Sequence, residues 1–375
     1  MGERAQPRPG GGEVGGRAIV VGLGLIGSSL ALALRGARWE VAGADANRAR
    51  AQRALELGIV DSLEVDAALA HGARHASLAF VATPVAAIAG VARDLLARDE
   101  TGELIVSDVG SVKGGIVRGV DHPRFVGGHP MAGSEQEGPD GADGDLFAGA
   151  TWVLTPTRST DPGAFATVRG VVASLGAEPV ALEPERHDGL VAVVSHVPHL
   201  AAASLMGLAA DASVEHGVLL RLAAGGFRDM TRIAAGDPAI WPDIFQDNAS
   251  AVLSVLDGLC ARLGEARRVI AEQDRAGLVA LLEHAKAARR NLPARVERPE
   301  ELLECRVPVP DRPGVLAEVT TALGARGVNI WDLEIAHSAE GPRGVLVLAI
   351  DAQAAPDARA ALGELGYRPA IRRIG

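Results

Sequence analysis

Three glycines within six residues constrain the fold of this chain more than any other feature of its sequence. They stand at Gly22, Gly24 and Gly27, with Leu25 and Ile26 between the last two. An apolar run, RAIVV, precedes them and a segment of helical period follows. In a strand–turn–helix unit the first glycine permits the tight turn, the second admits a ligand close to the backbone, and the third lets helix and strand pack closely. The pattern alone is weak. In this context it predicts a dinucleotide diphosphate at the helix N-terminus, where unpaired N–H groups favour an anion.

A carboxylate closes the second predicted strand, WEVAGAD. Asp45 stands about twenty residues after Gly22, where an acidic side chain accepts hydrogen bonds from the adenosine ribose hydroxyls and repels a 2′-phosphate. Arg48 and Arg50 lie nearby in the sequence and would weaken that repulsion. We therefore expect NAD to be preferred over NADP. The alternative is a plain glycine turn with a helix-capping Asp.

Strands and helices alternate over residues 17–185. The runs HASLAFVATP, ELIVSDVG, GATWVLTPT and AEPVALEP repeat the pattern of the first strand. This alternation predicts a doubly wound parallel sheet of the Rossmann type. Residues 1–16 are rich in Gly and Pro and hold no apolar run, so we expect a disordered leader.

Strand patterns are absent from residues 186–298, where alanine- and leucine-rich segments predict an all-helical domain. It has too much apolar surface for one small layer, so we expect a homodimer built on it. Residues 302–375 follow a charged, proline-containing linker and predict a small α+β unit. Arg, Asp and Glu are expected to interrupt the apolar stretches short of a membrane span, which predicts no association with membranes.

Composition excludes several functions. The 37 Lys and Arg are outnumbered by 47 Asp and Glu, giving a net charge of −10, so no broad basic surface for nucleic acid is expected. The two cysteines, Cys260 and Cys305, fall in different predicted domains. That argues against a disulfide framework or a cysteine metal site and predicts a cytoplasmic location.

Three polar segments follow the glycine turn. Ser111 lies in SDVGSVK, just after a predicted strand, at the sheet edge where doubly wound folds bind ligands. His129 lies in GGHPMAGSE, on a loop constrained by a diglycine and a proline. In the helical region, VVSHVPH contains His196 and His199, and GGFRDMTRIA contains Arg232.

The order of GLGLIGSS, SDVGSVK, GGHPMAGSE, VVSHVPH, GGFRDMTRIA and DPAIW resembles the prephenate and arogenate dehydrogenase family over residues 17–298. The resemblance implies NAD-dependent oxidative decarboxylation of prephenate to 4-hydroxyphenylpyruvate in tyrosine biosynthesis. It implies that His129 accepts the proton of the ring hydroxyl, a task suited to an unperturbed pKa of roughly 6.5. Ser111 would then orient His129 and the hydroxyl.

The same resemblance implies a binding site for the rest of the substrate. Arg232 would clamp a substrate carboxylate through its guanidinium fork. His199, and with less support His196, would contact the pyruvyl end. Glu135 could pair with Arg232 and gate entry.

Each of these residues has an alternative interpretation. His196 could cap a helix, Arg232 could be a surface cation, and Ser111 could cap a helix with Lys113 as its solvated neighbour. Trp241 is expected to pack in the core or an interface rather than to contact substrate. A metal site made of His196, His199 and His187-Asp188 is not expected, because no Glu or Cys completes it.

The C-terminal unit resembles the ACT family of amino-acid-sensing domains through the motifs DRPGVL and GVNI. The resemblance implies that backbone amides at the start of a helix bind the carboxylate of an amino acid. Tyrosine is the natural effector of such an enzyme, and the alternative is a domain that only dimerises. The residues expected to bind the effector are Asp311, Pro313, Gly314, Val315, Leu316 and Asn329.

Three rival functions remain open. An arogenate dehydrogenase has the same chemistry, and its substrate bears an amine in place of the keto group. A β-hydroxyacid dehydrogenase relies on a catalytic lysine, whereas the GGHP loop supplies a histidine. A non-catalytic sensor of NAD and amino acids would not need His129, Ser111 and Arg232.

Overall fold

The computed structural model describes residues 16–64, 76–133, 136–238, 240–290, 302–310, 312–337 and 343–373. The chain divides into two compact units, Met1–Ala261 and Arg262–Gly375. Three of the expectations above concern residues outside the described ranges: the disordered leader apart from Gly16, the gating role of Glu135, and the effector contact of Asp311.

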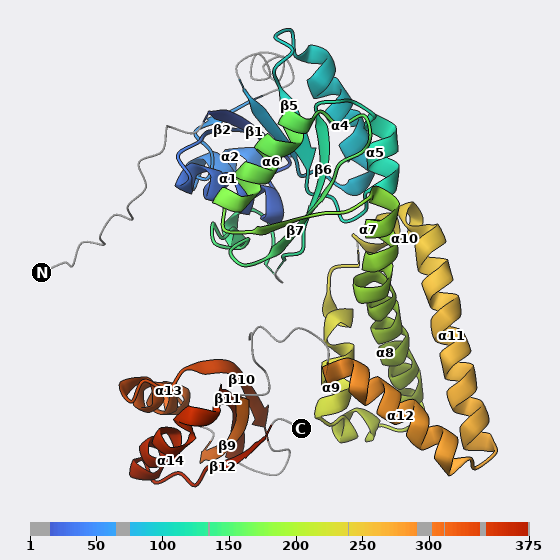
Figure 1. Ribbon diagram of the computed structural model, residues 1–375, viewed down its shortest axis with the longest axis vertical. Helices are drawn as coiled ribbons and strands as arrows, with labels where there is room; N and C mark the ends of the chain where they lie inside the picture. The colour runs from blue at the N-terminus through green and yellow to red at the C-terminus, as the bar shows by residue number, and fades with distance from the viewer. Residues whose placement is uncertain are drawn as a thin grey trace, which may run out of the picture. The chain divides into compact units, whose positions relative to one another are not determined.

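An eight-stranded sheet forms the centre of the first unit (Figure 1), in the order β3-β2-β1-β4-β5-β6-β7-β8. The strand order reverses between β1 and β4, the switch point at which doubly wound sheets bind ligands. The expected Rossmann-type sheet is therefore confirmed. The strands are β1 (Arg17–Val21), β2 (Glu40–Ala44), β3 (Ser62–Leu63), β4 (Leu78–Val81), β5 (Ile105–Asp108), β6 (Phe125–Pro130), β7 (Thr151–Thr155) and β8 (Glu178–Ala181).

One pair of strands departs from the parallel arrangement. β7 runs antiparallel to β6, with His129 opposite Val153, whereas β8 is parallel to β7. No α-helix occurs in the described residues between β6 and β7, and β7 runs back directly beside β6. An antiparallel neighbour needs no crossover helix, which explains the reversal.

Helices cover both faces of the sheet. Buried side chains of α1, α2 and α6 form one core around Phe80 and Trp152, and those of α4 and α5 form a second core around Ile88 and Leu95. The flanking helices are α1 (Leu25–Gly36), α2 (Arg48–Glu56), α4 (Val85–Arg98), α5 (Gly114–Val120) and α6 (Pro162–Ser174).

The helical region begins with a long continuous helix in which a π-helical turn (Ala192–His196) joins α7 (Pro184–Val191) to α8 (Val197–Glu215). The described part of residues 184–290 contains no strand, as expected. The other helices here are α9 (Gly225–Thr231), α10 (Trp241–Asp247), α11 (Ala249–Ala271) and α12 (Arg275–Arg290).

The expectation that charged residues interrupt the apolar stretches short of a membrane span is wrong in this region. The helix over Pro184–Val214 is long and apolar enough, by length and composition, to cross a membrane. Residues 189–210 contain no Asp, Glu, Lys or Arg, so charges do not interrupt the stretch. The same helix bears four buried polar side chains, His187, Asp188, His196 and His199, and the hydrogen bonds of the first three lie within the first unit. One third of its most apolar 18-residue window is buried within the isolated chain.

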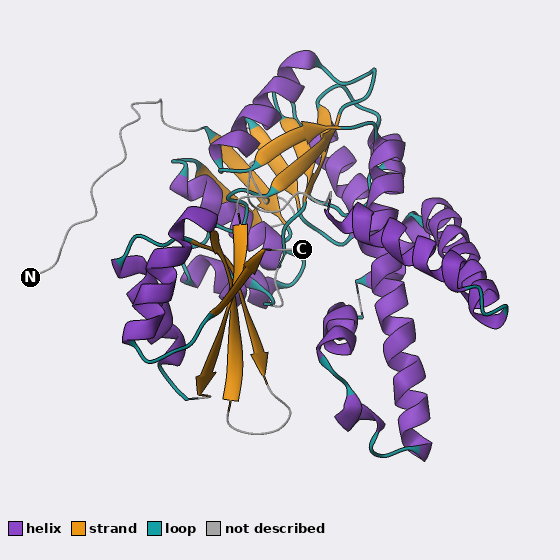
Figure 2. Ribbon diagram, turned by 60° about the horizontal axis from the view of Figure 1, so that its bottom comes forward, coloured by secondary structure: helices purple, strands orange, loops and turns teal. Residues whose placement is uncertain are grey.

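The second unit contains a four-stranded antiparallel sheet in the order β10-β11-β9-β12, with two helices on one face (Figure 2). This is the ferredoxin-like α+β fold expected for an ACT domain. Its core includes Cys305, which is buried, whereas Cys260 on α11 is exposed; both thiols are free. The elements are β9 (Leu302–Pro310), α13 (Val315–Ala325), β10 (Ile330–His337), β11 (Arg343–Asp351), α14 (Ala355–Glu364) and β12 (Ala370–Arg373).

Candidate active site

The three glycines after β1 differ in what surrounds them. Gly22 has a φ of +97°, and a Cβ there would lie 2.4 Å from the carbonyl oxygen of Ala82. A Cβ on Gly27 would lie 1.8 Å from the carbonyl oxygen of Gly22. A Cβ on Gly24 would have no atom within 4 Å. The protein's own packing thus requires the outer two glycines, while the middle one leaves open space beside the N-terminus of α1, as a bound diphosphate requires.

Asp45, the residue after β2, connects this strand to the glycine turn through a hydrogen bond. Its carboxylate accepts hydrogen bonds from the backbone N–H of Leu23 (2.8 Å) and of Asn47 (2.7 Å). The guanidinium of Arg50 lies 3.4 Å from the same carboxylate. Because this cation partly compensates the carboxylate, the repulsion that Asp45 exerts on a 2′-phosphate is weaker than for an isolated acid.

Thr83, which no sequence motif pointed to, follows β4 at the switch point of the sheet. Its hydroxyl is buried and has no hydrogen-bond partner among the described residues. The position of a Cβ on Gly22 would lie 2.8 Å from the backbone nitrogen of Thr83, so the backbone of this residue lies against the glycine turn. A buried hydroxyl without a partner is destabilising unless a ligand satisfies it, so the residue fits a cofactor site.

A buried ion pair anchors the next part of the site. Lys113 and Asp108 are fully buried and form a salt bridge. The ammonium also donates to the carbonyl of Gly128 (2.7 Å), and the carboxylate accepts from the backbone N–H of Gly110 (2.8 Å) and of Gly128 (3.0 Å). Burial lowers the pKa of Lys113, and the neighbouring Asp108 opposes that shift. The alternative interpretation in which Lys113 is a solvated neighbour of Ser111 is therefore wrong. Its charge fixes the diglycine that precedes His129.

His129, near the end of β6, faces a second histidine. Its Nδ1 lies 2.8 Å from Nε2 of His187 on α7, and the two rings are nearly perpendicular. Nδ1 of His187 in turn lies 2.8 Å from the Asp188 carboxylate, which also accepts hydrogen bonds of 2.8 Å from the backbone N–H of Lys113 and of Gly114. The sequence analysis considered His187-Asp188 only as metal ligands. In the described part of the chain no group of three or more His, Cys, Asp or Glu could hold a metal ion.

The charge state of this arrangement follows from its surroundings. Burial lowers the pKa of His129 well below 6.5, and the nearby His187, Lys113 and His196 lower it further. Burial would raise the pKa of Asp188, but hydrogen bonds from His187 and from two backbone amides outweigh it, so that pKa is lowered. At neutral pH the site therefore holds a neutral His129 beside an ionised Asp188.

Ser111 does not supply the hydrogen bond expected of it. Among the described residues, the side chain bonded to His129 is that of His187, and no hydrogen bond joins Ser111 to His129. Ser111 is half-buried in the loop between β5 and α5. Its role toward substrate stays a prediction.

The other two predicted histidines pack against Trp241. The His196 ring is buried, accepts a hydrogen bond at Nδ1 from the Asn248 amide (3.1 Å), and meets Trp241 edge-on. Burial lowers its pKa to about 4. His199 stacks on Trp241 with ring centroids 3.6 Å apart. Trp241 thus packs against the rings of both histidines, in line with the expected packing role.

Arg232 begins the short helix that follows α9, and its side chain is exposed. In the second unit, Pro313 and Gly314 form an exposed turn before α13, and Gly314 has a φ of +85°. Asn329 is exposed just before β10. The side chain of Arg312 pairs with Glu318 across the start of α13. The roles of Arg232 and of these turn residues in binding stay predictions.

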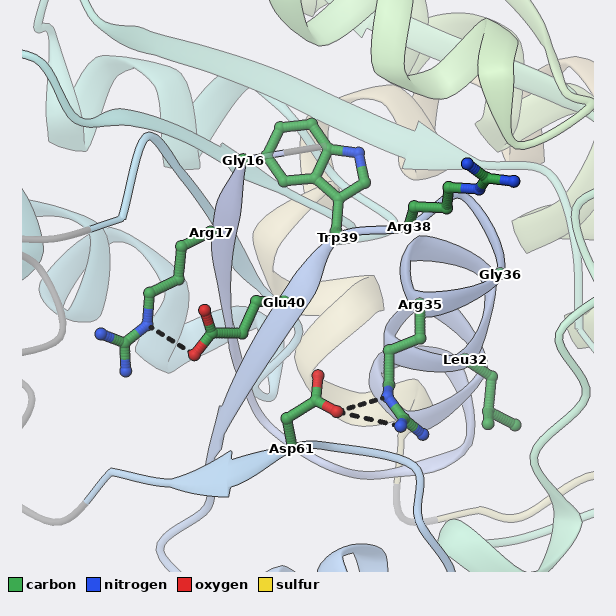
Figure 3. A pocket seen from close by; sticks show the side chains of 9 residues that line it. All are labelled: Gly16, Arg17, Leu32, Arg35, Gly36, Arg38, Trp39, Glu40 and Asp61. Atoms are coloured by element: carbon green, nitrogen blue, oxygen red, sulfur yellow. Dashed lines mark hydrogen bonds and ion pairs between the residues drawn. The ribbon is translucent and has the colours of Figure 1, made fainter. Parts of the chain in front are cut away.

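A hollow of about 800 Å³ lies elsewhere, at the amino-terminal ends of β1 and β2 (Figure 3). Ion pairs occupy its walls, Arg35 with Asp61 at 2.9 Å and Arg17 with Glu40 at 3.8 Å. Doubly wound sheets bind ligands at the opposite, carboxyl edge. We therefore expect a ligand at the carboxyl edge, where His129 lies, rather than in this hollow.

Comparison with known proteins shows which family the chain resembles. The chain matches the models of the prephenate dehydrogenase nucleotide-binding domain (residues 29–181), the prephenate dehydrogenase dimerization domain (183–284) and the ACT domain (304–367). The prephenate dehydrogenase of Bacillus subtilis is 35% identical over 338 residues, which cover 88% of this chain and 90% of the relative.

Two solved structures are similar over about three quarters of this chain. That of Aquifex aeolicus prephenate dehydrogenase in complex with hydroxyphenyl propionate and NAD+ is 32% identical, with a TM-score of 0.70 over 74% of this chain and 98% of that one. The arogenate dehydrogenase of Synechocystis is 33% identical, with a TM-score of 0.66 over 74% of this chain and all of that one.

Proposed function

The chain belongs to the prephenate dehydrogenase family, and from this we propose that it oxidises and decarboxylates prephenate to 4-hydroxyphenylpyruvate. The observation that carries the proposal is a neutral, half-buried His129 at the carboxyl edge of a sheet whose first turn is shaped for a dinucleotide. NAD, held by the turn at Gly22–Gly27 and by Asp45, supplies the hydride acceptor when it is bound.

His129 performs the proton transfer. The ring hydroxyl gives its proton to the histidine as the hydrogen on the same carbon leaves as hydride. The bond from the ring to its carboxylate then breaks, carbon dioxide leaves, and the electron pair enters the ring. The oxygen, now a phenolate, takes the proton back, so the reaction consumes and releases no net proton. The gain of aromaticity drives it forward.

The remaining contacts are assigned by chemistry. Arg232 offers a planar fork of donors to a substrate carboxylate, and its exposed side chain is reachable from solvent. Ser111 and His199 would contact the substrate hydroxyl and the pyruvyl end. His196 is buried behind Trp241, which favours a supporting role.

Replacing His129 with Asn tests the proposal. We expect kcat for prephenate to fall by roughly 10²–10⁴, the range for losing a positioned general base, while the Kd for NAD changes little. His122→Asn is the matched control, because His122 is half-buried on the loop before β6 and outside the site; its kcat should stay within about twofold. Near-normal turnover by His129→Asn would remove this residue from the mechanism.

Arogenate is the alternative substrate, favoured by the similarity to the Synechocystis arogenate dehydrogenase. Arogenate bears an amine where prephenate bears a keto group, so the two differ at the end of the side chain and share the ring chemistry. Steady-state assays of both substrates with NAD decide between them by comparing kcat/KM.

We also propose a cytoplasmic homodimer with tyrosine as effector. The matched helical model is described as a dimerization domain. Its helices expose large apolar side chains that a second subunit could cover, among them Leu208, Val214, Leu253, Leu263 and Leu282.

The free cysteines fit a reducing compartment. The exposed turn at Pro313 and Gly314 offers backbone amides at a helix N-terminus to an amino-acid carboxylate.

A further inference from the structure

We propose that His187, together with Asp188, is a positioning residue for the proton transfer. It holds His129 in the one neutral tautomer that can accept the substrate proton, and it links the resulting imidazolium to a buried carboxylate. The inference rests on the proposed role of His129 as proton acceptor and adds how the protein prepares that acceptor.

The hydrogen bonds fix the tautomers in sequence. An ionised carboxylate only accepts, so Nδ1 of His187, 2.8 Å from Asp188, must bear the hydrogen. In the proposed arrangement Nε2 of His187 is the acceptor and bears a lone pair. That nitrogen lies 2.8 Å from Nδ1 of His129, so Nδ1 of His129 must be the donor. The lone pair of His129 is left on Nε2, the nitrogen not engaged by His187.

The same series of hydrogen bonds connects His129 to a negative charge, which would oppose the effect of burial on the imidazolium that forms. Lys113 and Asp108 form an ion pair with each other, whereas Asp188 is bonded to the His187 imidazole and to two backbone amides. When Nε2 of His129 takes the proton, the imidazolium gains an anionic partner through His187. A carboxylate acts in this way on the histidine of a catalytic triad, where it sets the tautomer and stabilises the imidazolium. The titratable groups that face the hydrogen bonds from His129 to Asp188 are Asp108, Lys113, His187, Asp188, His196 and Asp247.

Asp188 is held so that little reorganisation is needed. Its two oxygens accept from the backbone N–H of Lys113 and of Gly114, at the start of α5. Its own carbonyl accepts from the amide of Asn248 (2.9 Å). The carboxylate is therefore fixed by the end of the loop that contains Ser111 and by the start of α5, and the backbone by Asn248, the C-cap residue of α10. Preorganised groups of this kind favour the charged state without moving during the reaction.

The decisive measurement is the tautomer of His129, read from ¹⁵N chemical shifts of the full-length protein labelled at histidine and assigned by loss of signal in His129→Gln. We expect hydrogen on Nδ1 at pH 7.5 in the wild type. In His187→Phe, which keeps a ring but neither hydrogen bond, we expect conversion to the Nε2–H form that free neutral histidine favours. His187→Gln, whose side-chain carbonyl can still accept from Nδ1, should keep the wild-type tautomer.

Turnover supplies the second readout. His187→Phe should lower kcat for prephenate by about 10²–10⁴, as expected for a wrongly protonated base, and His187→Gln should recover part of that loss. Val168→Ala is the control for loss of folding stability alone, because it removes two methyl groups from a buried residue of α6 in the core. It should leave kcat and the tautomer of His129 unchanged.

An Nε2–H tautomer on His129 in the wild type overturns the proposal, even if His187→Phe does not fold. So does a kcat for folded His187→Phe equal to that of Val168→Ala. The tautomer is measured without substrate. A protein with the expected tautomer but no prephenate activity would therefore contradict the proposed function alone, and an active enzyme with the other tautomer would contradict only the role of His187.

Discussion

At the residue scale, two buried carboxylates organise the site. Asp108 accepts from an ammonium and two backbone amides, and Asp188 accepts from a histidine and two backbone amides. A buried charge is tolerated only with such a full set of partners. Removing one member of a buried pair costs about 3–5 kcal/mol, because the other charge is left uncompensated. Substitutions at these positions therefore affect folding as well as chemistry.

Cofactor choice is also decided by single residues. We expect kcat/KM with NAD to exceed that with NADP by at least about tenfold, since one unfavourable contact of roughly 1.4 kcal/mol gives that ratio. Arg50 compensates Asp45, so Arg50→Ala should increase the preference. Arg53→Ala on the same helix, whose partner is Asp140, is the control and should leave the ratio unchanged. Equal use of both cofactors by the wild type would show that Arg50 cancels the carboxylate.

At the element scale, the features predicted correctly from the sequence are those that depend on residues close together in the chain. The glycine spacing after β1 identified the nucleotide turn, and the alternation of apolar runs identified the sheet, because both are short-range signals. The contact between His129 and His187 joins residues 58 positions apart on a strand and a helix, and no periodicity reports such a contact. The burial of Lys113 was missed for the same reason: its partners lie on two different strands. The reversal of β7 was missed because an apolar run does not state its direction.

The junction of β1 and α1 gives a test at this scale. Gly27→Ala should weaken NAD binding by at least tenfold and lower Tm, because its Cβ would fall 1.8 Å from a backbone oxygen of the same turn. Gly36→Ala, at the other end of the same helix, meets no atom within 4 Å. It should bind NAD normally and leave Tm unchanged or slightly raised. Equal NAD affinities in the two variants would mean that the turn does not shape the cofactor site.

At the scale of the whole molecule, the question is how the C-terminal unit influences catalysis. An effector shifts an equilibrium only if it binds the two states with different affinity. We expect tyrosine to inhibit the full-length enzyme, and deletion of residues 302–375 to leave kcat for prephenate largely intact while abolishing the inhibition. Tyrosine titrations of both proteins, at matched prephenate and NAD, measure this. Equal inhibition would place tyrosine in the catalytic site instead.

The two cysteines give this chain a selective chemical handle. Burial raises the pKa of the Cys305 thiol to about 11, so it forms little thiolate and is shielded from reagents. Cys260 projects from α11 into solvent in the isolated chain. In the dissociated subunit a maleimide fluorophore should therefore attach at one known position without any engineered substitution. Because that position lies on a helix of the dimerization domain, energy transfer between differently labelled protomers would follow subunit exchange in the unmodified sequence.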